Sequence, residues 1–327
     1  MKTEMGVTFG SLGVLGTKKA PGVAMQAQEL GFESFWTVEA TGTDAFTLLG
    51  AASMAAPKLD LGTGIIPIQL RSPTLAAMSA ASLQALNPEV NTLLGVGVSA
   101  PGILTQHGID AAEKPIRLMR EYVALLRECF SGEQVNFEGD YFSTKKFRLG
   151  IKPVEKKPKI IMAALNPQML KLAGEIADGV LLNYLPATHV EPSIKRVREG
   201  GNAKIYAYVH ASVTDFEKAQ SSARRDLFNY AMADGYARMF SEAGFADEGS
   251  ELREKQRNRD REGALAAISE EMIQAIDFIG SPSEVKQFVS SYAEAGVDHS
   301  ILMPMPWGED RNKVAVETME AAISSTK

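Results

Sequence analysis

Few residues of this chain have the type and spacing that side-chain catalysis requires. Glu39 follows the apolar run FWTV and offers a carboxylate for acid–base chemistry, and His107 lies in a predicted loop with an imidazole that exchanges protons near neutral pH. The sequence contains no H-E-x-x-H, no G-x-S-x-G and no P-loop motif. No pair of histidines has the spacing of a metal site, so we expect no bound metal. The four histidines are His107, His189, His210 and His299.

A different signal comes from the strand-like run LDLGTGIIP, which carries Gly62 and Gly64 before Ile65. Glycine inside a strand loses side-chain packing and usually marks a bulge or a close approach by another group. The other predicted strand ends are rich in glycine, proline and apolar residues rather than in acids and bases. We therefore expect a flat, largely apolar ligand, namely a cofactor that carries the chemistry while the protein binds and orients it.

The stretch LNPQMLKLAG predicts a helix start that suits an anion. Asn166 is a good N-cap, Pro167 fits the first turn, and the backbone N–H groups of Gln168 and Met169 would be free. Such an end attracts a phosphate through its donors and the helix dipole. A well-capped helix without any ligand fits the same residues.

Eight short apolar runs must position these residues, and each is followed by a helical pattern. Continuous apolar runs joined by helices indicate parallel strands that are covered on both faces. Eight such units in 327 residues fit a closed (β/α)₈ TIM barrel of the α/β class. An open doubly wound sheet would need G-x-G-x-x-G after the first strand, and GSLGVLG at 10–16 misses that spacing. The predicted strands are 5–10, 33–39, 59–67, 91–98, 159–165, 178–185, 203–213 and 298–305.

Two segments interrupt the repeat, and we expect both to be insertions in a single domain, 1–327. EQVNFEGDYFSTKKFRL alternates in polarity around Gly139-Asp140, which predicts a hairpin over about 133–150, before the fifth strand. The charged stretch FADEGSELREKQRNRDREG falls in a second insertion, about 234–263, after the seventh strand. We expect this stretch to be a solvated loop or an exposed helix.

The composition is that of an ordinary soluble protein, with 45% hydrophobic and 23% charged residues. A net charge of −6 disfavours a nucleic-acid partner, which would require a basic face. No apolar run reaches the roughly 18 residues of a membrane span, and the first residues lack the apolar stretch of a signal peptide. We therefore expect a cytoplasmic protein with a small-molecule substrate and without a nucleic-acid or membrane partner.

Six motifs together make the chain resemble the luciferase-like monooxygenase superfamily, and within it the coenzyme F420-dependent oxidoreductases similar to methylenetetrahydromethanopterin reductase. They occur in family order and cover essentially the full length. The motifs are LGFESFWTVEA (30–40), LDLGTGIIPIQLRSP (59–73), LLGVGVSAP (93–101), REYVALLRECFSGEQVNFEGDYF (120–142), AALNPQMLKLAGEIADGVLLNY (163–184) and IGSPSEVKQFVSSYAEAGVDHSILMP (279–304).

The resemblance implies that coenzyme F420, or alternatively FMN, binds at the C-terminal face of the barrel. It also implies a bulge after the third strand with a non-prolyl cis peptide, which maps to Gly64–Ile65 and places Ile65 against one face of the ring. The cofactor phosphate maps to the helix after the fifth strand. The cofactor-binding residues expected on this basis are Phe9, Glu39, Gly64, Ile65, Gly97, Val98, Leu165, Asn166, Met169 and Asn183.

The chain departs from parts of the superfamily at two acid–base positions. Flavin-dependent members often carry Glu-His-His where this chain has Glu39-Ala40-Thr41, and Val98 replaces the glutamate of the sugar-phosphate dehydrogenase branch. Glu39 is either a proton-relaying residue near the ring or a structural partner of a loop amide or a basic side chain. His107 is either catalytic at the substrate mouth or a solvated loop residue.

The resemblance thus implies an F420-dependent oxidoreductase that transfers a hydride between the deazaflavin and a small organic substrate. The substrate itself is not identified by the sequence. The alternatives are an FMN-dependent monooxygenase of the same fold and a flavin-binding protein without catalytic activity. Family members are often dimers through the helices that flank the second and third strands, so we expect a homodimer.

Overall fold

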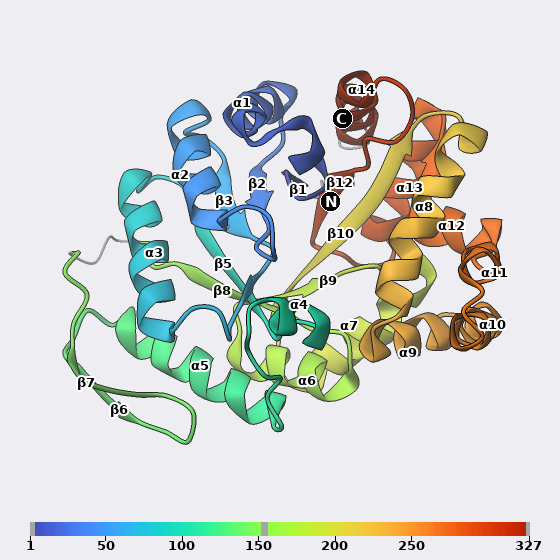
Figure 1. Cartoon of the computed structure of the whole chain (residues 1–327). Helices are drawn as coiled ribbons and strands as arrows, with labels where there is room; N and C mark the ends of the chain where they lie inside the picture. Colours follow the sequence, from blue (N-terminus) through green and yellow to red (C-terminus); the bar gives the residue numbers. More distant parts are fainter. Residues whose placement is uncertain (1–3, 152–155, 325–327) are drawn as a thin grey trace.

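A computed structural model describes residues 4–151 and 156–324 of the chain. Eight parallel strands close into a barrel in the order β1-β2-β3-β5-β8-β9-β10-β12, with helices around it (Figure 1). The predicted TIM barrel is therefore confirmed. The barrel strands are β1 (Glu4–Thr8), β2 (Ser34–Thr37), β3 (Asp60–Thr63), β5 (Thr92–Gly97), β8 (Lys159–Ala163), β9 (Gly179–Leu182), β10 (Lys204–Val213) and β12 (His299–Pro304).

The helices cover the outer faces of the strands, which explains why the strands are apolar throughout. Among the described residues, no helix is both long and apolar enough to cross a membrane. The helices are α1 (Ala20–Leu30), α2 (Ala45–Ala55), α3 (Pro73–Leu86), α4 (Pro101–Gln106), α5 (Pro115–Cys129), α6 (Pro167–Ile176), α7 (Val190–Arg198), α8 (Phe216–Ala231), α9 (Asp234–Glu242), α10 (Ala246–Arg257), α11 (Arg261–Ala266), α12 (Glu270–Ile276), α13 (Pro282–Glu294) and α14 (Arg311–Ile323).

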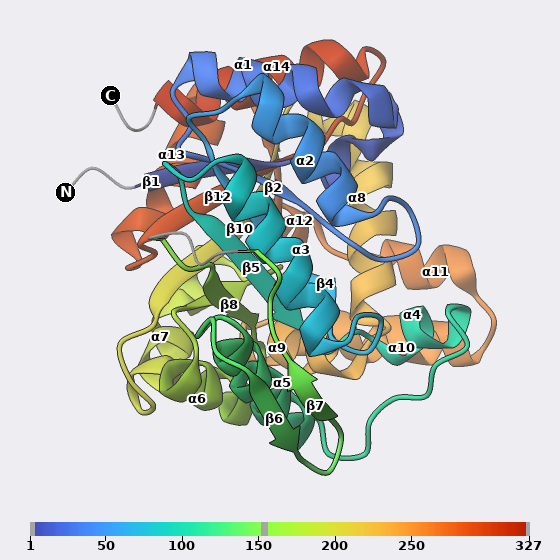
Figure 2. The same ribbon diagram turned by 90° about the vertical axis from the view of Figure 1, so that its left-hand side faces the viewer.

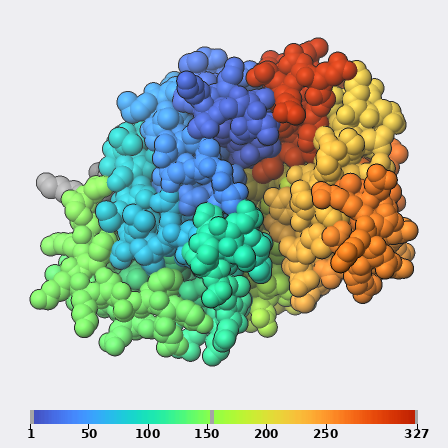
Figure 3. Space-filling model, viewed as in Figure 1, coloured from blue at the N-terminus to red at the C-terminus, as the bar shows by residue number. Residues whose placement is uncertain are grey.

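Both segments that interrupt the repeat form structures of their own outside the barrel. Strands β6 (Val135–Glu138) and β7 (Ser143–Phe147) pair antiparallel and project as a hairpin, as the alternating pattern predicts (Figure 2). The charged stretch is helical rather than a loop, because it forms α10 and α11. These helices lie with α9 on one flank of the molecule, coloured yellow to orange in Figure 3.

The strand β11 (Asp277–Gly280) is not indicated by the sequence pattern. It follows α12 directly and pairs in parallel with β10, which is ten residues long and offers an edge beyond its contacts with β9. Only four residues are involved, too few for a period to stand out. The register sets His210 of β10 beside Asp277 of β11.

Large side chains fill the barrel interior. Alternate residues of β10, namely Tyr206, Tyr208 and His210, share one face of that strand, and the two tyrosines pack with buried Trp36. The rings of Trp36 and Tyr206 meet edge to face with centroids 5.7 Å apart. A Cβ on Gly62 would lie 2.3 Å from the Trp36 ring, so the indole is one of the groups that approach the glycine-bearing strand.

Candidate active site

A cavity of about 470 Å³ opens at the C-terminal ends of the strands, where a TIM barrel holds its active site. Its walls come from the segments after β1, β2, β3, β5, β8 and β9, from β10 and the end of β12, and from α8 and α9. Most of the residues expected from the sequence line it. Those that do are Glu39, Gly64, Ile65, Val98, Leu165, Asn166, Met169 and Asn183.

The bulge after β3 contains the expected cis peptide between Gly64 and Ile65. Hydrogen bonds from both sides hold it: the Gly64 N–H donates to Thr37 O over 2.7 Å, and the Tyr208 hydroxyl donates to Gly64 O over 3.0 Å. The Glu39 N–H donates to Ile65 O over 3.1 Å. A Cβ on Gly64 would lie 1.9 Å from the Tyr208 oxygen, so this position requires glycine.

Two expected cofactor-binding residues lie outside the cavity lining. Gly97 stands behind Ile65, where an added Cβ would come within 3.1 Å of the Ile65 side chain. Its position therefore makes room for Ile65 rather than for a ligand. Phe9 is buried in the core and packs against Phe35, with ring centroids 6.5 Å apart, so its place in the structure is that of a core residue.

Both carboxylate oxygens of Glu39 are bound by neighbouring groups. Arg71 donates from Nε to Oε1 over 2.7 Å and from Nη2 to Oε2 over 2.9 Å, and the Ala45 N–H donates to Oε2 over 3.1 Å. The two side chains are 11% and 14% exposed, and the Glu39 carboxylate raises the pKa of Arg71. Of the two roles considered for Glu39, this geometry supports the structural partner of a loop amide and a basic side chain.

His107 lies outside the cavity, in an adjoining groove of about 480 Å³ that Glu39 and Ala40 also border. It ends α4, and its Nε2 donates to the carbonyl oxygen of Ala40 over 2.8 Å. This bond ties the loop after β5 to the loop after β2. The structure thus places His107 as a link between two loops at the rim.

The start of α6 differs in one respect from the expectation. Asn166 is the N-cap, but its Oδ1 accepts the Met169 N–H over 2.9 Å, so that donor is engaged and was wrongly expected to be free. The side chain competes with an anion for the same group. The helix still begins at the cavity, with Leu165 and Met169 in the lining and the positive end of its dipole toward the space.

Several polar side chains of the cavity wall are not predicted by the sequence analysis. Tyr208 follows from the alternation in YAYVH, which places every second residue of β10 inside the barrel. The others come from the end of β9 and from α8 and α9, whose contribution to the wall is a matter of tertiary packing. The missed polar residues are Tyr184, Tyr208, Asp226, Tyr230 and Tyr236.

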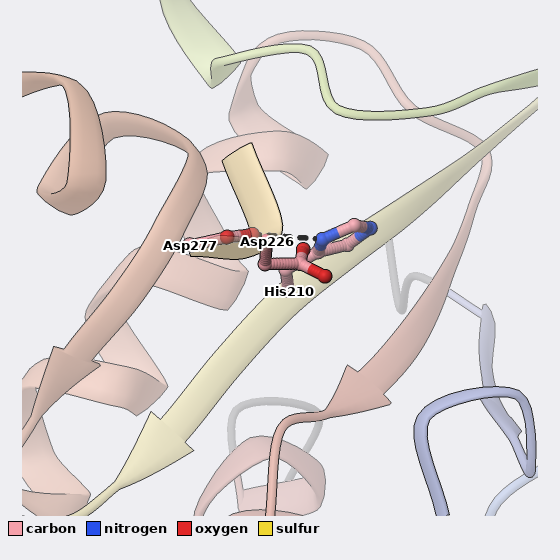
Figure 4. A group of neighbouring side chains, drawn as sticks. All are labelled: His210, Asp226 and Asp277. Atoms are coloured by element: carbon pink, nitrogen blue, oxygen red, sulfur yellow. Dashed lines mark hydrogen bonds and ion pairs between the residues drawn. The ribbon is translucent and has the colours of Figure 1, made fainter. Parts of the chain in front are cut away.

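His210, Asp226 and Asp277 come together in the interior beside the cavity (Figure 4). His210 Nδ1 lies 2.9 Å from Asp277 Oδ1, and its Nε2 lies 3.0 Å from Asn183 Oδ1. The Tyr184 hydroxyl donates to Asp226 Oδ2 over 2.6 Å. Burial lowers the pKa of His210 to about 4 and raises those of Asp226 and Asp277 to about 7 and about 8. These residues come from β10, α8 and β11, so their spacing in the sequence carries no signal.

Comparison with known proteins identifies the class of this barrel. The family model for luciferase-like monooxygenases matches residues 10–299, and the chain belongs to this family. Within it, the chain is an oxidoreductase that groups with coenzyme F420-dependent enzymes. It is 26% identical to 5,10-methylenetetrahydromethanopterin reductase from Archaeoglobus fulgidus over 303 residues, which cover 88% of this chain and 89% of that protein.

Solved structures of two F420-dependent enzymes share the fold over the whole of both chains. The coenzyme F420-dependent tetrahydromethanopterin reductase from Methanopyrus kandleri matches with a TM-score of 0.79 at 21% identity. An F420-dependent secondary alcohol dehydrogenase, in complex with an F420–acetone adduct, matches with a TM-score of 0.79 at 19% identity.

The residues of the cavity fit a flat ring. Ile65 projects from the bulge into the cavity, and Gly95 and Gly97 leave the space that its side chain needs. A Cβ on Gly97 would crowd that side chain. Gly235 also lines the cavity, and a Cβ there would meet only Leu165 Cδ1, at 3.9 Å, so the space beside it is open. The apolar side chains of the lining include Val98 and Met169. An apolar slot that ends at a helix start suits a tricyclic ring with a phosphate-bearing chain.

Proposed function

We propose that this protein is a coenzyme F420-dependent oxidoreductase that transfers a hydride between the deazaflavin and a small organic substrate. The observation that carries the proposal is the placement of Ile65 in the cavity by the bulge, with Gly97 behind it. The names of the relatives and the full-length match to their fold add support.

When bound, the deazaflavin supplies or accepts the hydride. Ile65 would press on one ring face and leave the other open to the substrate, which sets the direction from which the hydride moves. The start of α6, with Leu165, Asn166 and Met169, would hold the phosphate through the helix dipole. The apolar wall would exclude water from the reacting atoms.

Cofactor titration tests this proposal. We expect the fluorescence of coenzyme F420 to be quenched when it binds to the protein, with a dissociation constant in the micromolar range or below. FMN should bind at least about tenfold more weakly, a difference of about 1.4 kcal/mol in binding free energy. Tight FMN binding together with no affinity for F420 would show an FMN enzyme instead. Tight F420 binding without turnover of any carbonyl or alcohol substrate would favour a binding protein without activity.

We also propose that the chain forms a homodimer through α2 and α3, which pack side by side on the barrel surface (Figure 2). Neither helix contains a charged residue. Their outer faces expose large apolar side chains, and such contiguous apolar surface usually marks an interface. The exposed residues are Met54, Leu75, Met78 and Leu86.

The double substitution Met54→Glu and Met78→Glu should convert a dimer into a monomer, because it buries two carboxylates in an apolar contact. Light scattering after size-exclusion chromatography measures the change. Met232→Glu, at another exposed methionine, is the matched control and should leave the mass unchanged. A wild-type protein that is monomeric at high concentration would refute the dimer.

A further inference from the structure

The hydrogen bonds of Asn183 determine which nitrogen of His210 carries a proton. Asn183 Oδ1 accepts the Tyr184 N–H over 3.1 Å, and its Nδ2 donates to the Tyr236 hydroxyl over 3.2 Å, so the orientation of the amide is set. The amide oxygen can only accept. The contact of 3.0 Å with His210 Nε2 is therefore a bond in which Nε2–H donates.

The other ring nitrogen must share a proton with Asp277. His210 Nδ1 and Asp277 Oδ1 are 2.9 Å apart, and two lone pairs at that distance would repel each other, so one proton lies between them. Both side chains are almost completely buried, at 1% and 0% exposure. Burial favours a neutral ring beside a protonated carboxyl, because this arrangement leaves no charge in the interior.

Asp226 extends this group to the cavity. Asp277 Oδ2 is buried and has no hydrogen-bond donor among the N–H and hydroxyl groups of the described residues, and an Asp226 oxygen lies within 4.8 Å of the Asp277 carboxyl. Two carboxyls this close do not ionise together readily, so they tend to retain a proton. Asp226 lines the cavity and also a second pocket of about 780 Å³.

From this geometry we infer that His210, Asp277 and Asp226 form a proton relay, and that Asp226 is the acid that protonates the substrate as its carbon receives the hydride. The inference rests on the proposed function. Reduction of a polar double bond adds a hydride to carbon, breaks the π bond and leaves its electron pair on the heteroatom, which takes the proton of Asp226. The two electrons come from the reduced deazaflavin.

Asp226 regains its proton from Asp277 or from water in the second pocket, and in the oxidative direction it accepts the proton instead. Tyrosines face the two carboxyls from the packed elements, and burial raises the pKa of each. They are Tyr184 after β9, Tyr230 of α8 and Tyr292 of α13. Tyr208 of β10 packs against the His210 ring, and Tyr236 of α9 bonds to Asn183. The charged groups beyond Asp226, in the second pocket, are Lys218, Arg225, Glu309 and Arg311.

The relay can be tested on the protein without cofactor. Infrared spectra at neutral pH should show the carbonyl stretch of a protonated carboxylic acid. Asp277→Asn should weaken this band, and Asp277→Asn combined with Asp226→Asn should remove it. Asp277 has a raised pKa in the folded state, so folding takes up a proton that the unfolded chain releases. The contribution of Asp277 to stability therefore falls as the pH rises from about 4 to about 8, and this contribution should be absent in Asp277→Asn.

Kinetics test the role of Asp226. Asp226→Asn should lower kcat at least about 100-fold while the dissociation constant of F420 stays unchanged, because asparagine keeps the shape but cannot donate an acidic proton. Wild-type kcat/KM should fall as the pH rises through about 7, since the acid must be protonated. Asp277→Asn should move this limb to lower pH, because it removes the neighbouring carboxyl with which Asp226 retains a proton. Glu217→Gln, an exposed carboxylate of α8, is the control.

Three results would overturn the relay. They are the absence of the carboxylic-acid band, an Asp226→Asn enzyme with wild-type kcat, and one divalent cation per chain that is lost in Asp277→Asn, which would make the same three residues a metal site. If the wild type fails to bind F420, the proposed function fails. The infrared, stability and metal measurements still decide whether the buried protons exist, because they need no cofactor.

Discussion

Gly64→Ala should weaken the binding of coenzyme F420 at least about 100-fold, equivalent to about 2.8 kcal/mol. The new Cβ would lie 1.9 Å from the hydroxyl oxygen of Tyr208 and 2.8 Å from its Cζ. Tyr208 is 3% exposed and packs in the barrel interior, so it has no free space to enter. The bulge must shift instead, and Ile65 moves with it. Fluorescence titration measures the loss, and circular dichroism checks the fold.

A second substitution sharpens this prediction. Gly64→Ala combined with Tyr208→Phe removes the atom at 1.9 Å but leaves the ring carbons at 2.8 and 3.2 Å, so we expect partial recovery of the affinity. Gly22→Ala on α1 is the matched control, because an added Cβ there meets no atom within 4 Å. Near wild-type affinity of Gly64→Ala would mean that the ring does not depend on the bulge.

Arg71→Met should cost about 3 kcal/mol of folding stability. It leaves the Glu39 carboxylate, which is only 11% exposed, with the Ala45 N–H as its hydrogen-bond donor and without the cation that balances its charge. Glu39→Gln should cost a similar amount, since it leaves the guanidinium with the more exposed Asp44 alone. For a domain of 327 residues the loss corresponds to a melting temperature lower by roughly 4 °C.

The double variant separates the two roles considered for Glu39. If the residue is structural, the two substitutions share one interaction, and Arg71→Met with Glu39→Gln costs much less than the sum of the single variants. If Glu39 relays a proton, Glu39→Gln loses kcat while Arg71→Met retains most of it. Arg120→Met, which removes the exposed ion pair with Glu175, is the control and should change stability by about 1 kcal/mol or less.

The barrel could be predicted from the sequence because each strand is a continuous apolar run that is followed by a helical pattern. The bulge could be predicted because glycine in a buried strand needs a physical reason, and the family resemblance supplied the position Gly64–Ile65. The structure adds the reason for each glycine. Trp36 occupies the space beside Gly62, and Tyr208 occupies the space beside Gly64.

The polar side of the cavity could not be predicted in the same way. Asp226 lies in a helix of mixed polarity, where an acidic side chain is expected to face solvent. Asp277 starts a strand of only four residues. His210 has no other histidine at metal-ligand spacing in the sequence. Only the register of β10 with β11 and the packing of α8 bring these side chains together. Such long-range pairings leave no local period in the sequence.

The hydrogen bond of the Tyr208 hydroxyl limits which segments of this enzyme can accept substitutions that alter its substrate specificity. One strand, β10, holds the bulge through Tyr208 and carries His210 two residues further on, so the wall proposed to contact the ring and one member of the inferred relay depend on the same strand. The segments around α4 and α9 border the same cavity from outside that strand. Substitutions there, except at Tyr236, which bonds to Asn183, can alter which substrates enter without displacing the reacting groups. Directed evolution toward new substrates should therefore accumulate changes in these two segments and leave β10 untouched.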